Sequence, residues 1–249
     1  MPTVPPLLAP TQSDAATSLR AFLLDVMPAG TEVVLGQPNQ VPEPAGDMFV
    51  VMTPIRLMRL GTNLGTGFDV KFVGSISGGN ILTVTSVVRG LIIKNSLLYG
   101  VGLENLNIRI LSQIYGIPGG VGTYQLSTAS NIGAETLAGG YWQYLQPAEL
   151  TVQMDFHSAD TTGGDMAQAV STLFRSEYGT RFFKSLGPDV TPLYADDPGQ
   201  RPFLNDQQQI EWRWVLDARL QVNDIAQIGQ QFADTVQIRR IMVDAPYPS

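Results

Sequence analysis

The segment from Gly61 to Gly140 differs sharply in composition from the two segments that flank it. It contains 16 of the 25 glycines, one of the 17 prolines, none of the three tryptophans and only seven charged residues. Glycine permits the positive φ angles that tight turns between short β-strands need. We therefore predict that residues 61–140 form a small β-barrel or sandwich module, inserted into a host domain built from residues 1–60 and 141–249.

The overall composition narrows the class of protein. A chain of 249 residues, 44% of them hydrophobic, can fill a real core, and its apolar runs are far shorter than the roughly 20 residues of a membrane helix. It has no cysteine, which excludes disulfides and thiolate chemistry, and its single histidine, His157, excludes a His-rich metal site. The proline-rich N-terminus lacks the basic residues of a secretion signal, so we expect no export by that route and no membrane partner.

The charge balance argues against ordinary nucleic-acid binding. The chain carries 22 acidic and 15 basic residues, for a net charge of −7. Nucleic-acid binding relies on basic patches that neutralise phosphates, and this composition does not favour them. The same balance is compatible with DNA that passes the protein without adhering to it.

The N-terminal host segment combines a helix, strands and a loop. Apolar residues at three-to-four spacing predict a helix over residues 11–27, with Ser13 or Asp14 as its N-cap. A β-branched strand is predicted at residues 31–35. The proline-rich segment 37–47 that follows is longer than most loops, and we interpret it as a contact arm.

Two strands flank the inserted module. Residues 48–60 form one, and residues 141–157 form the other, in which apolar and polar residues alternate strictly from Leu150 to His157. We expect the two strands to pair antiparallel, as a hairpin whose tip is replaced by the module. The alternation places His157 on the solvent-exposed face, so His157→Ala should lower the free energy of unfolding by no more than about 0.5 kcal/mol.

The C-terminal host segment begins with a second helix and ends in a long hairpin. The helix is predicted to start near Asp165, with Thr162 at capping-box spacing, and to extend through Phe183. Residues 187–209 are predicted to be an irregular loop. Strict alternation over 210–222 predicts a long strand, paired after a loop with 236–243. The expected fold class is α+β, a mainly antiparallel sheet flanked by two helices.

Candidate catalytic patterns are weak. The spacing Asp155-x-His157-x-x-Asp160 could hold a metal or act in acid–base chemistry, but solvated strand and loop residues are the better interpretation. Gly119 to Gly122 lacks the lysine of a phosphate-binding loop, and Asp196-Asp197-Pro-Gly is better read as a turn than as a calcium loop. The sequence predicts no enzyme, no cofactor and no metal.

The host motifs resemble a known family. They are, in order, Gln37–Pro42, Phe49–Pro54, Gln153–His157, Leu193–Asp197, Pro202–Asn205, Glu211-x-Arg213-Trp214 and Gln231–Asp234. In this order they are similar to the phage neck terminator, or tail terminator, proteins of tailed bacteriophages. The segments Gly74–Gly78, Leu82–Val84 and Gly119–Tyr124 resemble a glycine-rich β-module of phage virion proteins.

The resemblance implies a structural virion protein without catalytic residues. Such a subunit would close into a homohexameric ring on the tail tube, stop tube polymerisation and join the tail to the head-side connector at the tail–neck junction, after assembly in the bacterial cytoplasm. Its partners would be other copies of itself, the tail tube protein, the connector and, as an open question, the sheath, with DNA passing through the lumen unbound. A baseplate or fibre module that recognises a host surface is the alternative. Candidate contact residues are Pro38, Asn39, Val41, Pro42, Tyr194, Asp196, Asp197, Phe203, Trp212, Trp214 and Phe232.

Overall fold

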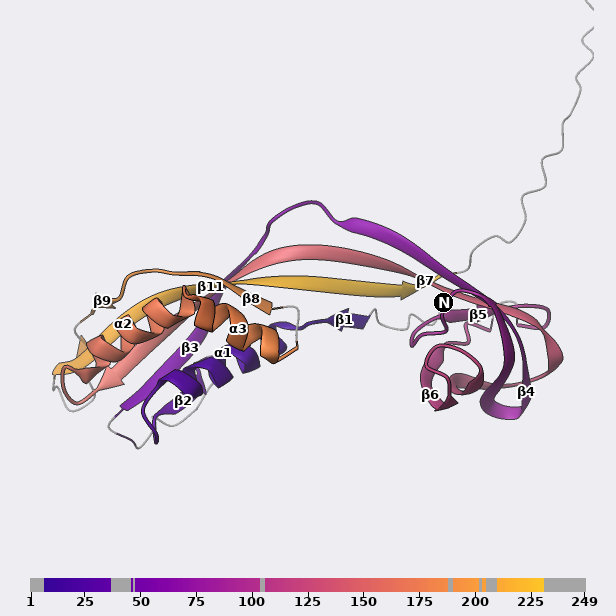
Figure 1. Cartoon of the computed structure of the whole chain (residues 1–249), viewed down its shortest axis with the longest axis horizontal. Coiled ribbons are helices and arrows are strands. Elements are labelled where there is room, and N and C mark those ends of the chain that lie inside the picture. Colours follow the sequence, from indigo (N-terminus) through magenta and orange to yellow (C-terminus); the bar gives the residue numbers. More distant parts are fainter. Residues whose placement is uncertain are drawn as a thin grey trace, which may run out of the picture. The chain divides into compact units, whose positions relative to one another are not determined.

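The computed structural model of the chain describes residues 7–36, 46, 48–103, 106–187, 190–201, 203–204 and 210–230. The chain divides into two compact units (Figure 1). Unit 1 comprises Met1–Thr66 and Gln143–Gln227, and unit 2 comprises Gly67–Trp142 with the segment that begins at Ile228. Helices and a mixed, mainly antiparallel sheet confirm the α+β class. The independence of an inserted module at 61–140 stays a prediction.

Most helices and strands belong to one of the two units, but the three longest strands have residues in both. Unit 1 contains β1 (Leu7–Ala9), α1 (Gln12–Val26), β2 (Glu32–Leu35), β3 (Met48–Arg59), α2 (Thr162–Phe174), α3 (Glu177–Ser185), β8 (Val190–Ala195), β9 (Gly199–Gln200) and β10 (Phe203–Leu204). Unit 2 contains β5 (Leu97–Tyr99) and β6 (Ile110–Gly116). The strands β4 (Leu64–Arg89), β7 (Gly122–Ser158) and β11 (Ile210–Gly229) have residues in both units.

The unit 1 sheet has the strand order β1-β11-β7-β3-β2. The predicted antiparallel pairing of β3 with β7 is confirmed, with a register from Met48 opposite Ser158 to Arg59 opposite Ala148 and a bulge at Ile55. β2 pairs with β3 in parallel. On its side away from β7, β11 pairs in turn with β10, β9, β8 and β1.

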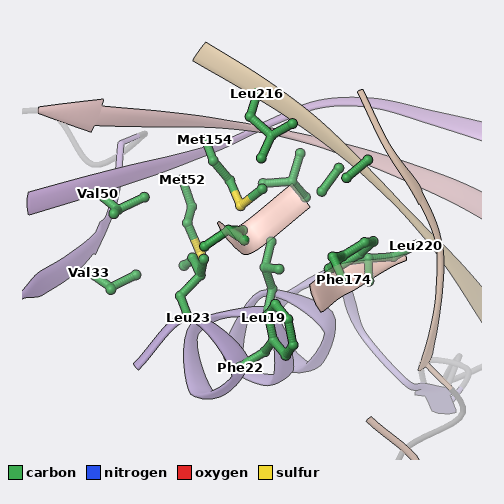
Figure 2. Close-up of a cluster of buried hydrophobic side chains, with 14 of the residues drawn as sticks. Leu19, Phe22, Leu23, Val33, Val50, Met52, Met154, Phe174, Leu216 and Leu220 are labelled. Atoms are coloured by element: carbon green, nitrogen blue, oxygen red, sulfur yellow. The ribbon is translucent and has the colours of Figure 1, made fainter. Parts of the chain in front are cut away.

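Three helices cover one face of this sheet. α1 begins at Thr11, whose hydroxyl accepts from the Asp14 amide while the Asp14 carboxylate accepts from the Thr11 amide, so Thr11 and not Ser13 or Asp14 is the N-cap. Apolar side chains of the helices and strands interdigitate beneath them (Figure 2). Residues labelled in Figure 2 include Leu19, Phe22, Val50, Met154, Phe174 and Leu216, all of which are buried.

Several C-terminal boundaries differ from the sequence predictions. α2 starts at Thr162, after an N-cap, Thr161, whose side chain makes no capping hydrogen bond. The segment expected to extend α2 is a separate helix, α3, because Ser176 accepts from the Tyr178 amide and begins a new helix. β11 continues through residues 223–229, where a loop was predicted. Its expected partner, 236–243, lies outside the described residues.

The predicted irregular loop at 187–209 is wrong in part, because it contains β8, β9 and β10. Its prolines suggested turns, yet Pro192 lies within β8 opposite Leu220. The Asp196 amide donates to the Asp217 carbonyl, so these two residues form a hydrogen-bonded pair. Bonded and non-bonded pairs alternate along the ladder, which makes Pro192–Leu220 a non-bonded pair and directs the Pro192 nitrogen away from β11. A proline is tolerated there because the missing N–H would not have bonded to the sheet.

Unit 2 is built from strands and turns, with no helix among its described residues. β4 doubles back on itself at Gly78, since Asp69 pairs with Arg89 and the Thr85 hydroxyl donates to the Val73 carbonyl. Gly78 has a φ of +61°, which permits this turn. The buried core of the unit consists of Val70, Phe72, Ile76, Leu82, Val84, Ile92, Leu98, Leu103, Ile108, Ile110, Tyr124, Leu126 and Leu137.

None of the helices that the structure describes combines the length and the apolarity needed to cross a bilayer.

Candidate interaction surface

A buried ion pair lies on the face of the unit 1 sheet opposite the helices. The Asp155 carboxylate on β7 accepts from the Arg213 guanidinium on β11 at 3.0 and 3.2 Å, and the Asp155 side chain is only 8% exposed. Two such contacts to one carboxylate give a fixed geometry. The interpretation of Asp155 as a solvated residue is therefore wrong, because the neighbouring strand supplies a cation that the spacing within β7 could not reveal.

A shallow polar cleft adjoins this ion pair. It has a volume of about 170 Å³ and is lined by Gln153, Asp196, Asp197, Gly199, Arg201, Val215 and Asp217. The Gln153 amide donates to the Asp217 carboxylate at 3.3 Å and so links β7 to β11 within the lining of the cleft. The cleft thus brings together two predicted contact residues, Asp196 and Asp197, with residues of the strand face that the sequence analysis did not select.

His157 is less exposed than predicted. Its ring stacks on Phe49, the residue opposite it in the β3–β7 register, with ring centres 4.4 Å apart and planes 10° apart. Phe49 is itself buried, so the imidazole serves as a partial cover for an apolar ring. His157 therefore packs against its neighbour, whereas the alternation along β7 alone predicted a fully wet side chain.

The Asp-x-His-x-x-Asp pattern does not form one site. Asp155 binds Arg213, His157 stacks on Phe49, and Asp160 accepts hydrogen bonds from the hydroxyl and the amide of Thr162 at the start of α2. These bonds to Thr162 lower the pKa of Asp160 below its ordinary value. Within the described ranges of the chain, no group of three or more His, Cys, Asp or Glu residues has the arrangement of a metal site.

The outer side of β8 is exposed and carries a cluster of aromatic and charged side chains. The Arg175 guanidinium of α2 lies 5.2 Å from the centre of the Tyr194 ring and donates to the Asp197 carboxylate at 3.2 Å. Asp196 lies 3.7 Å from Arg219 on β11. Tyr194 is 44% exposed and the Asp197 side chain is 85% exposed, so both remain accessible to a further molecule.

The two tryptophans of β11 have different environments. Trp214 is partly buried and packs against the core of unit 1, directly beside Gly164 of α2. A Cβ atom at Gly164 would lie only 2.8 Å from the Trp214 ring, so the glycine is required for this packing. Trp212 is 39% exposed. Of the two, Trp212 is the one whose ring another subunit can reach.

The distal part of β3 and the residue after it, residues 55–60 (distal β3 below), are exposed and largely apolar, which the sequence analysis did not single out. Ile55, Leu57, Met58 and Leu60 are all exposed, and Leu57 reaches 57%. β2 pairs only with residues 49–52, and no other described strand lies on that side of β3. The run of apolar residues in the sequence indicated a strand. It could not show that β2 is too short to cover the outer edge of distal β3, which no described strand covers.

The other predicted contact residues cannot be placed. Pro38, Asn39, Val41, Pro42 and Phe232 lie outside the described residues, and for Phe203 the structure describes only the backbone, in β10.

Comparison with protein families gives a match for this chain. A family model for phage neck terminator proteins matches residues 111–245. The match includes the motifs at 153–157, 193–197, 202–205, 211–214 and 231–234, whereas those at 37–42 and 49–54 lie outside it. It also begins within the glycine-rich segment 61–140. A search of curated proteins found no match.

Proposed function

This chain belongs to the phage neck terminator family, and we propose that it caps the phage tail tube as a homohexameric ring. Membership of this family indicates a structural role at the neck and tail of the phage. In our proposal the ring stops polymerisation of the tail tube and joins the tail to the head-side connector. Assembly takes place in the bacterial cytoplasm, before the tail meets the head.

The observation that carries this proposal is the family match together with the shape of the unit 1 sheet. Its helices lie on one face only, so its polar face and its two edges remain available to other subunits. A closed ring of identical chains needs two different contact surfaces on each chain, one for each neighbour. Tyr194, Asp196, Asp197 and Trp212 are exposed on this unit, and we retain them as contact residues.

The partners follow from the position of the ring. One side faces the tail tube protein and the other the head-side connector, and the sheath is a further neighbour if the tail contracts. Each subunit has a net charge of −7, so a ring of such subunits repels the phosphates of DNA and lets it pass through the lumen without adhering. The segment 61–140 is proposed to project from the outer rim of the ring, as an insert that leaves this channel open.

Electron microscopy of negatively stained protein, alone and mixed with purified tail tubes, tests the proposal. The expected result is a six-fold ring with a central hole, located at one end of the tubes, and native mass spectrometry should give the mass of six chains. A protein that remains monomeric in the presence of tubes, or that forms trimers bound to host surface material, would contradict the proposal.

A further inference from the structure

We infer that neighbouring copies join edge to edge, with the distal β3 strand (Ile55–Leu60) of one copy against the outer side of β8 of the next. This inference rests on the proposed ring, for which it names both halves of the subunit contact. Both surfaces belong to unit 1.

Some backbone hydrogen-bonding groups of distal β3 face away from every strand that the structure describes. The Leu60 amide donates to the Pro147 carbonyl of β7 at 3.0 Å. Because successive residues of an antiparallel strand face alternate sides, Leu57 and Arg59 direct their backbone N–H and C=O groups away from β7. No described strand pairs with that side of β3 beyond Met52. An exposed edge of this kind is a template for pairing with another chain.

The first half of the same sheet edge, where β2 pairs with β3, shows how an edge is protected. β2 has only four residues, and the Arg20 side chain of α1 donates to the Val33 carbonyl at 2.9 Å. A short strand capped by a charged side chain does not invite pairing. Distal β3 is longer and has apolar side chains on both faces. The bulge at Ile55 lies at its start, so the residues that follow form a regular strand. The contrast indicates that distal β3 is covered in the assembled protein.

The charges of distal β3 exclude self-pairing and favour an acidic partner. Residues 55–60 include Arg56 and Arg59 and no acidic residue. Two copies of this strand paired antiparallel about a two-fold axis would place arginines opposite arginines, which is unfavourable. The partner strand should therefore come from a different surface and carry carboxylates.

The outer side of β8 fits this description. Residues 190–197 contain Asp196 and Asp197 and no basic residue, and these carboxylates lie 3.7 Å from Arg219 and 3.2 Å from Arg175. Leu193 and Tyr194 are exposed between them and the start of the strand. β8 has six residues, as does the segment 55–60. The Pro192 nitrogen faces outward and removes one donor, so the contact depends on side chains and on the remaining carbonyl and amide groups.

The two surfaces lie at opposite edges of one four-stranded region. Leu57 is opposite Leu150 on β7, and Tyr194 is opposite Arg219 on β11. The contacts Asp155–Arg213 and Gln153–Asp217 show that β7 and β11 run antiparallel, which brings Leu150 near the level of Arg219. Leu57 on β3 and Tyr194 on β8 thus lie at a similar level along the strands, at opposite edges of the region β3-β7-β11-β8. Repetition of the contact adds each copy to the free edge of the last, as a heterologous ring requires.

Engineered cysteines test this contact directly, because the chain contains none of its own. We would introduce Met58→Cys and Tyr194→Cys in one chain and oxidise the assembled protein. Met58 lies opposite Glu149 and Tyr194 opposite Arg219, so both side chains lie on the sheet face away from the helices. Three strand spacings separate the two positions within a copy, about 14 Å, whereas a disulfide needs Cα atoms within about 7 Å. Disulfides can therefore form only between copies, and we expect a ladder of covalent oligomers on a denaturing gel that ends at the ring size.

Three controls decide the outcome. Each single cysteine variant should remain monomeric on the gel, and a covalent dimer of Met58→Cys alone would overturn the head-to-tail arrangement. The pair Leu24→Cys with Tyr194→Cys, in which Leu24 is an exposed residue of α1, should give no ladder. Thermal melts monitored by circular dichroism verify that each variant is folded. If the Met58→Cys/Tyr194→Cys protein forms rings yet is not cross-linked, the inference is overturned and the proposed function stands.

A charge-reversal series provides an independent test. Arg56→Glu with Arg59→Glu should lower the fraction of protein in rings by about tenfold or more, because like charges would then face each other across the contact. Adding Asp196→Arg and Asp197→Arg to the same chain should restore much of the assembly. Unchanged assembly in the first variant would overturn the inference. Absence of rings in the wild type, with no cysteine ladder, would instead overturn the proposed function as well.

Discussion

The hydrophobic cores of the two units are closed by different kinds of structure. In unit 1 the core is covered by helices, and the Phe22 ring of α1 meets Phe174, Phe182 and Phe183 with ring centres 5.5 to 5.6 Å apart. In unit 2 the described residues include no helix, and strands joined by glycine turns enclose the core. There the Tyr124 hydroxyl donates to the Gly120 carbonyl at 2.6 Å and ties a buried ring to a turn.

Because of this difference, the stability of each unit is sensitive to a different kind of substitution. The core of unit 1 depends on the volume of large side chains that fill the space between helices and sheet. The core of unit 2 depends also on backbone conformations that only glycine adopts without strain, as at Gly116, which has a φ of +115°. Substitutions that remove volume and substitutions that add a Cβ atom should therefore separate the two units.

The largest expected effect comes from removal of unit 2. Leu60 bonds to Pro147, so replacement of residues 61–146 by Asn-Gly would close a tight hairpin between β3 and β7. We expect a soluble protein with a cooperative melt that lacks one of the two transitions of the full chain in calorimetry. An insoluble product, or a melt without cooperativity, would show that unit 1 needs unit 2 and that the division into a host and an inserted module is wrong.

Truncation of one core phenylalanine in each unit should have a smaller and local effect. Phe22→Ala is expected to destabilise unit 1 by about 3–5 kcal/mol, and Phe72→Ala to destabilise unit 2 by a similar amount, because both rings are fully buried. Each variant serves as the control for the other. Calorimetry should show one shifted transition per variant, and an equal shift of both transitions would indicate a single cooperative structure.

Addition of one methyl group to a turn should destabilise unit 2 specifically. In Gly116→Ala the new Cβ would lie 2.2 Å from the Val121 carbonyl oxygen, and the positive φ would be strained. We expect a loss of about 1–3 kcal/mol. Gly133→Ala is the matched control, since nothing lies within 4 Å of its Cβ position, and it should change stability by less than about 0.5 kcal/mol. Similar losses in both variants would contradict the role given to the Gly116 turn.

Loss of the His157 ring should weaken unit 1 moderately. The stacked pair with Phe49 predicts that His157→Ala costs about 0.5–1.5 kcal/mol in chemical denaturation, more than a surface position would. His157→Phe, which preserves the stack, should retain most of the stability. If alanine and phenylalanine variants behave alike, the stack contributes nothing.

The smallest effect concerns the start of α1. Hydrogen bonds from the Thr11 amide and then the Thr11 hydroxyl lower the pKa of Asp14 below its ordinary 3.8. Because the native pKa is the lower one, the stabilisation is present above about pH 4 and is lost as the pH falls through the native pKa. Asp14→Asn should therefore lower the urea midpoint at pH 7 and differ less from the wild type at pH 3. An equal difference at both pH values would show that the carboxylate charge is irrelevant.

Much of unit 1 was predictable because its elements have clear periods. The three-to-four spacing of α1 buries one face, as the structure confirms. The alternation of β7 identified a strand, but Thr151 and Asp155 on its polar face are also buried. The N-cap of α1 was missed because the helix begins one residue before the expected caps, at a reciprocal pair formed by Thr11 and Asp14.

The features of the interaction surface could not be derived from local patterns. The Asp155–Arg213 pair depends on the register between β7 and β11, two strands far apart in the sequence. β8 was hidden by its proline, which is acceptable only because of the direction of its nitrogen in the sheet. The exposure of Leu57 depends on where β2 ends, which no pattern within β3 records. The candidate contacts at Tyr194, Asp196 and Asp197 rested on the family resemblance instead.

The pairing of β3 with β7 has a consequence for the order of events during synthesis. Leu60 and Pro147 are bonded neighbours, yet nearly the whole of unit 2 is encoded between them. A ribosome releases β3 well before the residues of β7 exist, and closing this contact early would cost the entropy of a long loop. If unit 2 folds first, it holds the two chain ends together and reduces that cost. Until then both edges of distal β3 are bare, because β2 pairs only with residues 49–52, and the nascent chain is vulnerable to aggregation through Ile55 and Leu57.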